Sequence, residues 1–193
     1  MIDRSSFGNL LDLNVQRNPG TRAPTVGELF RLVELDGDHA KAIAFNMLFV
    51  VWRKRTLAAV YRRSMAIAAE LAVQFPEGVG VCQTVEVDTT PPDGDARRAF
   101  VEFMKVDTVK HFSVIHDGTG FKAASVRAIM SSVHMLGRPK FRLAVHSSVP
   151  AAAAWHAVEQ VAIGRRETPE MIERVVRGLR QLHHDRYPDP ESR

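Results

Sequence analysis

Residues 79–115 read VGVCQTVEVDTTPPDGDARRAFVEFMKVDTVKHFSVI, and this stretch decides the fold class. The nearly continuous apolar runs Val79–Val87 and Val109–Ile115 are typical of strands buried on both faces. Between them, a Pro-Pro-Asp-Gly break at 91–94 precedes a segment in which apolar residues recur at helical spacing. A strand, a helix and a second strand in this order predict a parallel sheet covered by helices.

The same alternation continues toward the C-terminus. Gly118-Thr119-Gly120 leads into a predicted helix that ends at Gly137, and Phe141–Val145 predicts a short strand. Ser148 is the expected N-cap of the next helix, which Gly164 closes. We expect this helix to bury Trp155, Val158 and Val161 against the sheet.

A last helix begins at Thr168-Pro169-Glu170, which supplies a cap, a proline in the first turn and an early acid. Its apolar residues form one stripe at helical spacing: Met171, Ile172, Val175, Val176, Leu179 and Leu182. The stripe can dock on the domain or on a second copy of the chain. Docking on the domain is the simpler interpretation.

On the N-terminal side, Leu29–Leu35, the turn signal Asp36-Gly37-Asp38 and the apolar run Ala42–Trp52 predict a β-hairpin. As an alternative, Thr25 with Glu28 would cap a short helix. Thr56 is the expected N-cap of a helix that Phe75-Pro76 ends.

Together these segments predict a single α/β domain with a mixed, mostly parallel sheet and an additional C-terminal helix. Residues 1–28 show no sustained periodicity and are expected to form an arm or linker. The α/β domain then covers residues 29–164, the C-terminal amphipathic helix covers 165–187, and 188–193 form a tail.

Composition narrows the class of protein. The chain has 193 residues, of which 45% are hydrophobic and 25% charged, which suffices for one core. Its net charge of +4 is mild, and the basic residues lack the interleaved aromatics typical of nucleic-acid binding. The single cysteine, Cys82, excludes an intrachain disulfide. Without a recognisable secretory signal or membrane-spanning run, we expect a cytoplasmic protein.

Four local segments support a resemblance to a known group: Leu48–Trp52 followed by Thr56, Gly78–Val81, Gly120–Ala124, and Ser148-Val149 leading to Ala154-Trp155. With the order of elements, they resemble the STAS-like group over roughly residues 29–163. This is the fold of bacterial anti-sigma-factor antagonists of the SpoIIAA type, with which small CRAL-TRIO lipid-transfer-like domains are grouped. The resemblance implies a regulatory or scaffold protein that binds another protein or itself.

The STAS phosphorylation motif places an Asp-Ser pair, a small residue and a Gly at the turn between a central strand and the next helix. The corresponding turn here is Asp88-Thr89-Thr90-Pro91-Pro92, in which prolines replace the Gly. The resemblance therefore implies Thr89 and Thr90 as candidate phosphorylation sites, in a turn that the two prolines would stiffen.

Ligands of open parallel sheets collect at the carboxyl ends of the strands. This rule selects four loops, at residues 52–56, 88–93, 116–120 and 146–148. The candidate partner- or ligand-binding residues in these loops are Arg53, Lys54, Arg55, Asp88, His116, Asp117, Gly118, Thr119, Gly120 and His146.

Specific chemistry at these loops has weak support. Gly118 and Gly120 at a helix start could bind phosphate, but the Lys-Ser/Thr of a P-loop is missing and an ordinary glycine turn explains them. His116 or His146 beside a hydroxyl could act in hydrolysis, but no nucleophile elbow is present. The eight histidines are scattered, so no metal site and no cofactor are expected.

The sequence therefore predicts a non-enzymatic regulatory or scaffold protein that acts through protein–protein interaction and is a candidate for phospho-regulation. The alternative is a binder of a small anionic or lipidic ligand at the strand-end loops. A third class is a hydrolase or transferase that uses His116 and His146.

Overall fold

The computed structural model describes residues 29–188, and for residues 120–123 and 134 it describes the backbone only. The strands are β1 (Arg31–Leu35), β2 (His39–Ala44), β3 (Met47–Trp52), β4 (Val79–Val85), β5 (Val109–Ile115) and β6 (Arg142–His146). They lie in chain order in one sheet, with β1, β2 and β3 antiparallel and β3, β4, β5 and β6 parallel. The predicted α/β class and mixed, mostly parallel sheet are confirmed.

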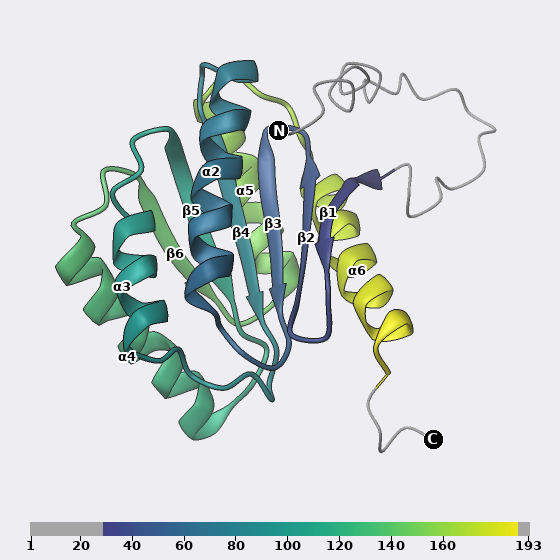
Figure 1. Cartoon of the computed structure of the whole chain (residues 1–193). Helices are drawn as coiled ribbons and strands as arrows, with labels where there is room; N and C mark the ends of the chain where they lie inside the picture. The colour runs from purple at the N-terminus through teal and green to yellow at the C-terminus, as the bar shows by residue number, and fades with distance from the viewer. Residues whose placement is uncertain (1–28, 189–193) are drawn as a thin grey trace, which may run out of the picture.

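The helices cover both faces of this sheet (Figure 1). The helices α2 (Ala58–Gln74), α3 (Gly94–Phe103) and α4 (Gly120–Gly137) connect the parallel strands, and α5 (Val149–Ala162) and α6 (Pro169–Arg186) follow β6. Because each crossover has the same hand and moves one strand along, α2, α3 and α4 lie on one face. The other face carries α5 and α6. Because β3 to β6 are parallel, their carboxyl ends share one edge of the sheet.

The N-terminal strands correct the predicted single hairpin. A turn at Phe45-Asn46 divides the apolar run 42–52 into β2 and β3, so three strands form a meander. Phe45 takes a positive φ of 58°, and Asn46 Nδ2 donates to the carbonyl of Gly78 at 2.8 Å. An unbroken apolar run has no period that would reveal a turn inside it. Asn46, its one polar residue, was the available signal.

Two apolar cores lie on the two faces. On the α2–α3–α4 face, Trp52, Tyr61, Phe100 and Phe112 form a row of aromatic rings with successive centroids 5.0, 4.8 and 5.7 Å apart. On the other face, α6 buries four residues of its stripe against β2 and β3: Ile172, Val175, Val176 and Leu179. The prediction that this helix docks on its own domain is confirmed.

Helix α5 buries a different face from the predicted one. Val158 and Val161 are 64% and 66% exposed, whereas His156, Glu159 and Gln160 are buried. The reason lies in the sheet, because β5 presents polar side chains to α5 and polar partners are needed to satisfy them. The expected inward packing of Val158 and Val161 was therefore wrong.

The predicted helix ends are confirmed at three positions. Ser148 and Thr168 accept hydrogen bonds from the backbone N–H groups of Ala151 and Met171, and Gly164 follows α5 with a φ of 81°. Two other predictions were wrong, one at the start of α2 and one at the end of α4. The N-cap of α2 is Leu57, because the Thr56 hydroxyl instead donates to the carbonyl of Thr90.

Gly137 is the last residue of α4 rather than its left-handed cap, and the positive φ belongs to Arg138 at 45°. A Cβ at Gly137 would lie 2.6 Å from Met104 Cβ, so glycine is needed here for close helix packing. The predicted arm at 1–28, the Thr25–Glu28 helix alternative and the tail beyond residue 188 lie outside the described residues.

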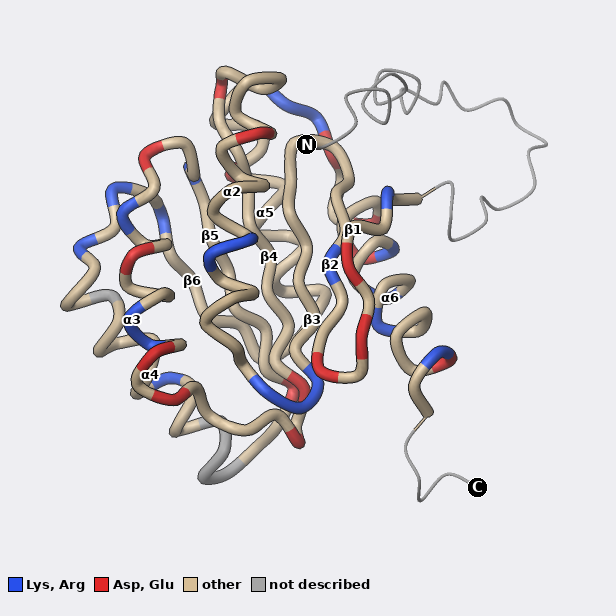
Figure 2. Tube along the Cα trace, viewed as in Figure 1, with Lys and Arg blue, Asp and Glu red and all other residues tan. Residues whose placement is uncertain are grey.

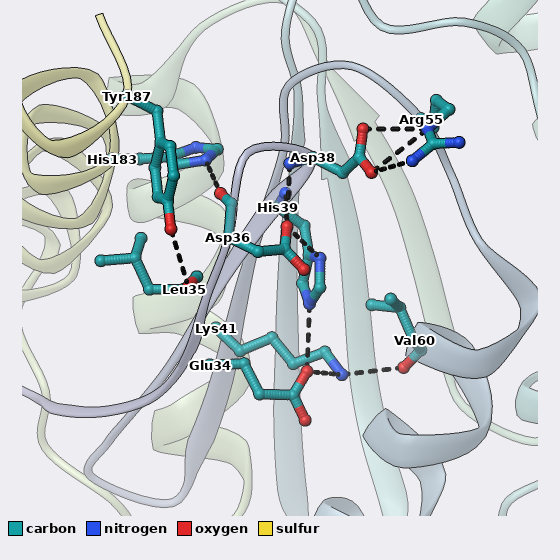
Figure 3. A network of polar contacts seen from close by, with 10 residues as sticks. All are labelled: Glu34, Leu35, Asp36, Asp38, His39, Lys41, Arg55, Val60, His183 and Tyr187. Carbon is teal, nitrogen blue, oxygen red and sulfur yellow. Dashed lines mark hydrogen bonds and ion pairs between the residues drawn. The ribbon is translucent and has the colours of Figure 1, made fainter.

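A polar cluster ties the β1–β2 turn to α2 and α6 (Figure 3). Lys41 is fully buried on β2, where its ammonium lies 2.8 Å from Glu34 Oε2 and donates to the carbonyl of Val60 in α2 at 2.9 Å. From α6, His183 donates its Nε2–H to the carbonyl of Asp36 at 2.6 Å. The cluster therefore joins three elements around one edge of the sheet.

Within residues 29–188, none of the helices is long and apolar enough to cross a membrane.

Candidate ligand-binding site

The strand-end loops selected from the sequence lie side by side. The Thr90 N–H donates to the carbonyl of Lys54 at 2.7 Å, which joins the loops after β3 and β4. The Thr89 hydroxyl donates to the carbonyl of Trp52 at 2.8 Å, and the His116 N–H donates to the carbonyl of His146 at 3.0 Å. These hydrogen bonds join the four loops in two neighbouring pairs along one edge.

A cavity of about 150 Å³ lies at this edge, on the α2–α3–α4 side of the sheet. Strands, helices and loops all contribute to its walls. Its lining residues are Thr56, Tyr61, Gln83, Val85, Val87, Thr89, Thr90, Pro91, Pro92, Phe100, Val114, His116, Ser125, Val126, Ile129 and Met130. The walls are mostly apolar, with a few polar groups among them, as is typical of small-molecule sites.

Gln83 is the first of two buried side chains in these walls that have a nitrogen without a hydrogen-bond partner in the described part of the chain. It lies near the carboxyl end of β4 and is 1% exposed. Its Oε1 accepts a hydrogen bond from the indole Nε1–H of Trp52 at 3.2 Å, which fixes the orientation of the amide. Its Nε2 is buried and has no hydrogen-bond partner in the described part of the chain.

His116 is the second, and it follows β5 directly. Its Nδ1 lies 2.9 Å from the carbonyl oxygen of Val85, which only accepts, so Nδ1 carries the proton of that bond. In the neutral ring Nε2 is then an acceptor, and it has no partner among residues 29–188. Gly118 makes room for the ring, because a Cβ at that position would lie 2.6 Å from His116 Nε2.

The charged residues of the strand-end loops pair with other parts of the molecule. Arg53 is buried and donates to the carbonyls of His183 and Tyr187 at the end of α6, where a cation also complements the helix dipole. Arg55 pairs with Asp38 at 2.6 Å, and this hydrogen bond holds the pKa of the Asp38 carboxyl below its usual value.

Asp117 and Glu86 both bind Arg180 of α6, at 2.6 and 2.7 Å. Figure 2 shows the basic residues after β3 beside acidic residues of the strand ends and of the β1–β2 turn. The described residues that line the cavity include no Lys, Arg, Asp or Glu. The cavity is therefore uncharged over its described walls, while the ion pairs lie around it.

The structure divides the predicted set of binding residues. Of these residues, His116 lines the cavity, as do the two candidate phosphorylation sites, Thr89 and Thr90. Arg53 and Asp117 bind α6, and His146 lies toward the other face, where its ring centroid is 5.6 Å from that of Trp155. Four of the others are exposed or begin α4: Lys54, Asp88, Thr119 and Gly120.

The two candidate phosphorylation sites differ in access. The hydroxyl of Thr89 is half-buried and bonded to Trp52, whereas Thr90 is exposed and donates to the carbonyl of Lys54 at 3.0 Å. Phosphorylation of either stays a prediction.

Sequence reasoning missed Gln83 and the walls supplied by Tyr61, Phe100 and α4. The signal for Gln83 was an amide inside an otherwise buried strand, VGVCQTV. Val126 and Ile129 of α4 also pack on the core of this face. Their second role, as walls of a cavity, has no signature in the sequence.

The opposite face of the sheet buries a continuous chain of hydrogen bonds beneath α5. Asn46 Nδ2 donates to the carbonyl of Gly78, and Gln160 Nε2 donates to Asn46 Oδ1. His111 Nε2 lies 3.2 Å from Gln160 Oε1, so it donates, and its Nδ1 lies 2.8 Å from His156 Nδ1. The direction of each of these hydrogen bonds follows from the Gly78 carbonyl at their end, because a carbonyl can only accept.

The same assignment of donors and acceptors extends from His111 to Cys82. With His111 Nδ1 accepting, His156 donates from Nδ1, and its Nε2 accepts from the Ser113 hydroxyl at 2.7 Å. Ser113 Oγ then accepts from the Cys82 thiol, 3.6 Å away. Burial raises the pKa of this thiol to about 12, so Cys82 keeps its hydrogen. All the hydrogen bonds of this chain run in one direction when both imidazoles are neutral.

Burial keeps the two imidazoles neutral. It lowers the pKa of His111 to about 4, against the hydrogen bond to Gln160, which raises it. It lowers the pKa of His156 well below the ordinary value, and repulsion from His111 and His146 adds to this. Ser113 and His156 resemble a nucleophile and its base, but both are fully buried, so no substrate reaches them.

Across residues 29–188, no group of three or more His, Cys, Asp or Glu side chains is arranged to hold a metal ion. Comparison of the chain with protein-family models, with curated proteins and with solved structures finds no match.

Proposed function

We propose that this chain is a non-enzymatic regulatory module that binds a small, uncharged, largely apolar molecule in the cavity at the carboxyl edge of the sheet. One observation carries the proposal. The mostly apolar cavity lies at the edge where the strand-end loops meet, and among its lining residues Gln83 and His116 are buried and each have a nitrogen without a partner in the described part of the chain.

Such groups are costly to leave unpaired. Each buried polar atom without a partner destabilises a fold by about 1–3 kcal/mol, and buried polar groups in native proteins are therefore nearly always satisfied. Both nitrogens are closed off from the cavity in this structure, so pairing with a bound molecule requires the two side chains to turn toward it.

The cavity also limits the size and charge of its occupant. At about 150 Å³ it matches engineered cavities that hold benzene, so it suits a single ring rather than an acyl chain. An anionic ligand finds no cation in the described walls, because Arg53 and Arg55 bind α6 and Asp38. The cavity therefore favours an uncharged one-ring ligand over the small anionic or lipidic ligand expected from the sequence.

A thermal-shift panel tests this proposal. We expect neutral one-ring molecules such as indole and cresol to raise the melting temperature and to shift amide resonances of α4, whereas benzoate and inorganic phosphate do not. Ile129→Phe fills the cavity and should abolish the response. Ala128→Phe, on the exposed side of the same helix, should retain it. An equal response of both variants, or a response to the anions alone, would contradict the proposal.

A regulatory role through protein–protein contact is the second candidate, and one observation favours it. Helix α4 lines the cavity with Val126 and Ile129, and near its end it exposes Met135 and Leu136, which are 71% and 66% accessible. Exposed large apolar side chains on a helix mark contact surfaces. The affinity of a partner that binds this helix would depend on whether the cavity is occupied.

Self-association tests this contact with the chain alone. In sedimentation velocity at high micromolar concentration, we expect the wild type to self-associate and Leu136→Glu to remain monomeric. Val73→Glu is the control, because Val73 is also strongly exposed but lies on α2. A monomeric wild type, or equal behaviour of both variants, would reject self-association through α4.

A further inference from the structure

The two edges of the sheet, β1 and β6, differ in their protection against pairing with another chain (Figure 1). The register of β1 shifts between Leu32 and Glu34, and the strand carries the charges of Arg31 and Glu34. Irregularities and charges are common means of protecting an edge strand. By contrast, β6 pairs regularly with β5, none of its five residues is buried, and Arg142 is its single charged residue. The β6 edge therefore lacks this protection.

The backbone of β6 has a defined outward side. The His146 carbonyl accepts from the His116 N–H at 3.0 Å, so the backbone groups of His146 face β5. Because successive residues of a strand alternate in direction, the backbone of Ala144 also faces β5, whereas that of Leu143 and Val145 faces away from it. Among the strands that the structure describes, only β5 pairs with β6. Two residues thus offer backbone donors and acceptors to a further strand.

Helix α5 adds an apolar surface beside this edge. Trp155 packs against His146 of β6, with ring centroids 5.6 Å apart. A carboxylate oxygen of Glu159 lies 3.0 Å from Nη1 of Arg142 in the same strand. The side of α5 that carries Trp155 and Glu159 therefore lies toward β6. Three exposed residues lie three or four positions from these two and share that side: Ala151, Val158 and Ala162. Glu159, the single charged residue of α5, is buried, so this surface is uncharged.

The residues of β6 are complementary to those of a second copy. In an antiparallel pair centred on Ala144, Leu143 lies opposite Val145 of the partner subunit, and the outward backbone groups of both face the junction. Such a pair exchanges two hydrogen bonds, and two-fold symmetry repeats them on the other side of Ala144. Arg142 lies opposite His146 of the partner subunit. Burial lowers the pKa of this imidazole, so the pairing does not bring two cations together.

We infer that this chain forms a symmetric dimer in which β6 pairs with β6 of a second copy, so that the sheet continues from one subunit into the other, and the exposed side of α5 packs against its counterpart. Because paired strands lie about 4.8 Å apart and α5 contacts both β5 and β6, the two α5 helices come within packing distance. The inference rests on the proposed self-association and specifies its interface. Residues 138–141 join the end of α4 to β6, so Leu136 lies near the same edge.

Disulfide cross-linking tests the register. Ala144→Cys places the two thiols opposite each other, because facing residues without hydrogen bonds between them have Cα atoms about 4.5 Å apart, which a disulfide can bridge. We expect this variant to become mostly disulfide-linked dimer under mild oxidation. Arg142→Cys is the matched control and should not cross-link, because it lies about 13 Å along the strand from its own counterpart. The native Cys82 is buried, so it gives no background.

Hydrogen exchange and a surface variant test the interface without a cross-link. In the wild type, protection of the Leu143 and Val145 amides should grow with protein concentration, whereas the Ala144 amide, which faces β5, should be protected throughout. In sedimentation velocity, Val158→Arg should weaken dimerisation about tenfold or more, because it places a charge in an apolar contact. Val73→Arg on α2 is the control and should change it less than about twofold. Both valines are strongly exposed, so both variants should fold.

The possible failures are distinguishable. If the wild type stays monomeric at high micromolar concentration, the proposed self-association itself is wrong. If it dimerises but Arg142→Cys cross-links as well as Ala144→Cys, or Val158→Arg dimerises like Val73→Arg, the β6 interface is overturned while self-association through α4 stands. Protection of the outward amides of β6 in a monomer would show that another segment covers this edge, which also overturns the inference.

Discussion

A chain of buried polar side chains beneath α5 contrasts with two buried polar side chains beneath α4. Beneath α5, the hydrogen bonds from Cys82 through Ser113, His156 and His111 to Gln160 join each of these side chains to the next. Beneath α4, Gln83 and His116 each keep one nitrogen without a partner among the described residues, beside a cavity of about 150 Å³. The first arrangement satisfies its members, and the second leaves two nitrogens unpaired.

This difference follows from the general cost of buried polarity. A fully satisfied network strengthens its members in a low-dielectric interior, whereas a partly satisfied one is destabilising. A protein retains the second kind where the missing partner comes from outside the chain. Four predictions test whether the two faces differ in this way.

The largest effect is expected for His156→Leu. The substitution leaves the Ser113 hydroxyl and His111 Nδ1 without their partner in a fully buried site. We expect a loss of about 3 kcal/mol or more in the free energy of unfolding, measured by urea denaturation. His184→Leu on the exposed surface of α6 is the control and should change stability little. A loss below about 1 kcal/mol for His156→Leu would mean that the chain of hydrogen bonds contributes little.

Acid should weaken the same face. The pKa of His111 is about 4 in the folded state and 6.5 is its ordinary value, so between these limits the unfolded chain binds more protons than the folded one. Stability therefore falls as the pH drops below 6.5, by up to about 1.4 kcal/mol per pH unit for each such histidine. His156, His146 and His183, whose pKa values burial also lowers, act in the same direction.

Urea denaturation at intervals from pH 7.5 to about 4.5 checks this slope. Carboxylates change the free energy of unfolding at lower pH values than the histidines do. For Glu34, the effect of burial, which raises the pKa, is outweighed by hydrogen bonds from Lys41 and His39, so its contribution is lost only below its ordinary value of 4.5. Stability that stays constant from pH 6.5 to 4.5 would show that the buried imidazoles accept protons without cost.

Gly80→Ala should have an intermediate effect. A Cβ at this position of β4 would lie 2.2 Å from His111 Cε1 and 2.8 Å from Met47 Cγ, so the imidazole must leave its place in the chain of hydrogen bonds. We expect a loss of about 1–3 kcal/mol in the free energy of unfolding. Gly94→Ala, where the nearest atom is the end of the Arg98 side chain at 3.6 Å, is the control. Equal stability of the two variants would indicate that the ring moves freely.

The smallest effect is expected for His116→Asn without ligand. The variant keeps the hydrogen bond to Val85 and removes a nitrogen that has no partner in the described structure. We expect stability to change by less than about 0.5 kcal/mol, in contrast to His156→Leu. Calorimetric melting of both variants side by side measures the contrast. A loss for His116→Asn as large as that for His156→Leu would remove the distinction between the two faces.

Much of the fold could be predicted from local patterns. Apolar runs located β4 and β5, Ser148 and Thr168 marked helix starts, and the apolar stripe of α6 identified its buried side. For the site, the rule of strand ends selected the correct edge and included His116. The turn at Phe45-Asn46 and the buried side of α5 could not be predicted, because an apolar run hides a turn and an alanine-rich helix has no clear apolar face.

The sequence by itself determined the class of the fold and the location of its strand-end loops, because both depend on periodicity, caps and breaks among residues close in the chain. Only the tertiary structure decided which polar groups are satisfied. Asn46 meets Gln160, and His111 meets His156, across separations of 114 and 45 residues. Whether a buried nitrogen has a partner depends on such distant contacts, and so does the cavity that Gln83 and His116 line.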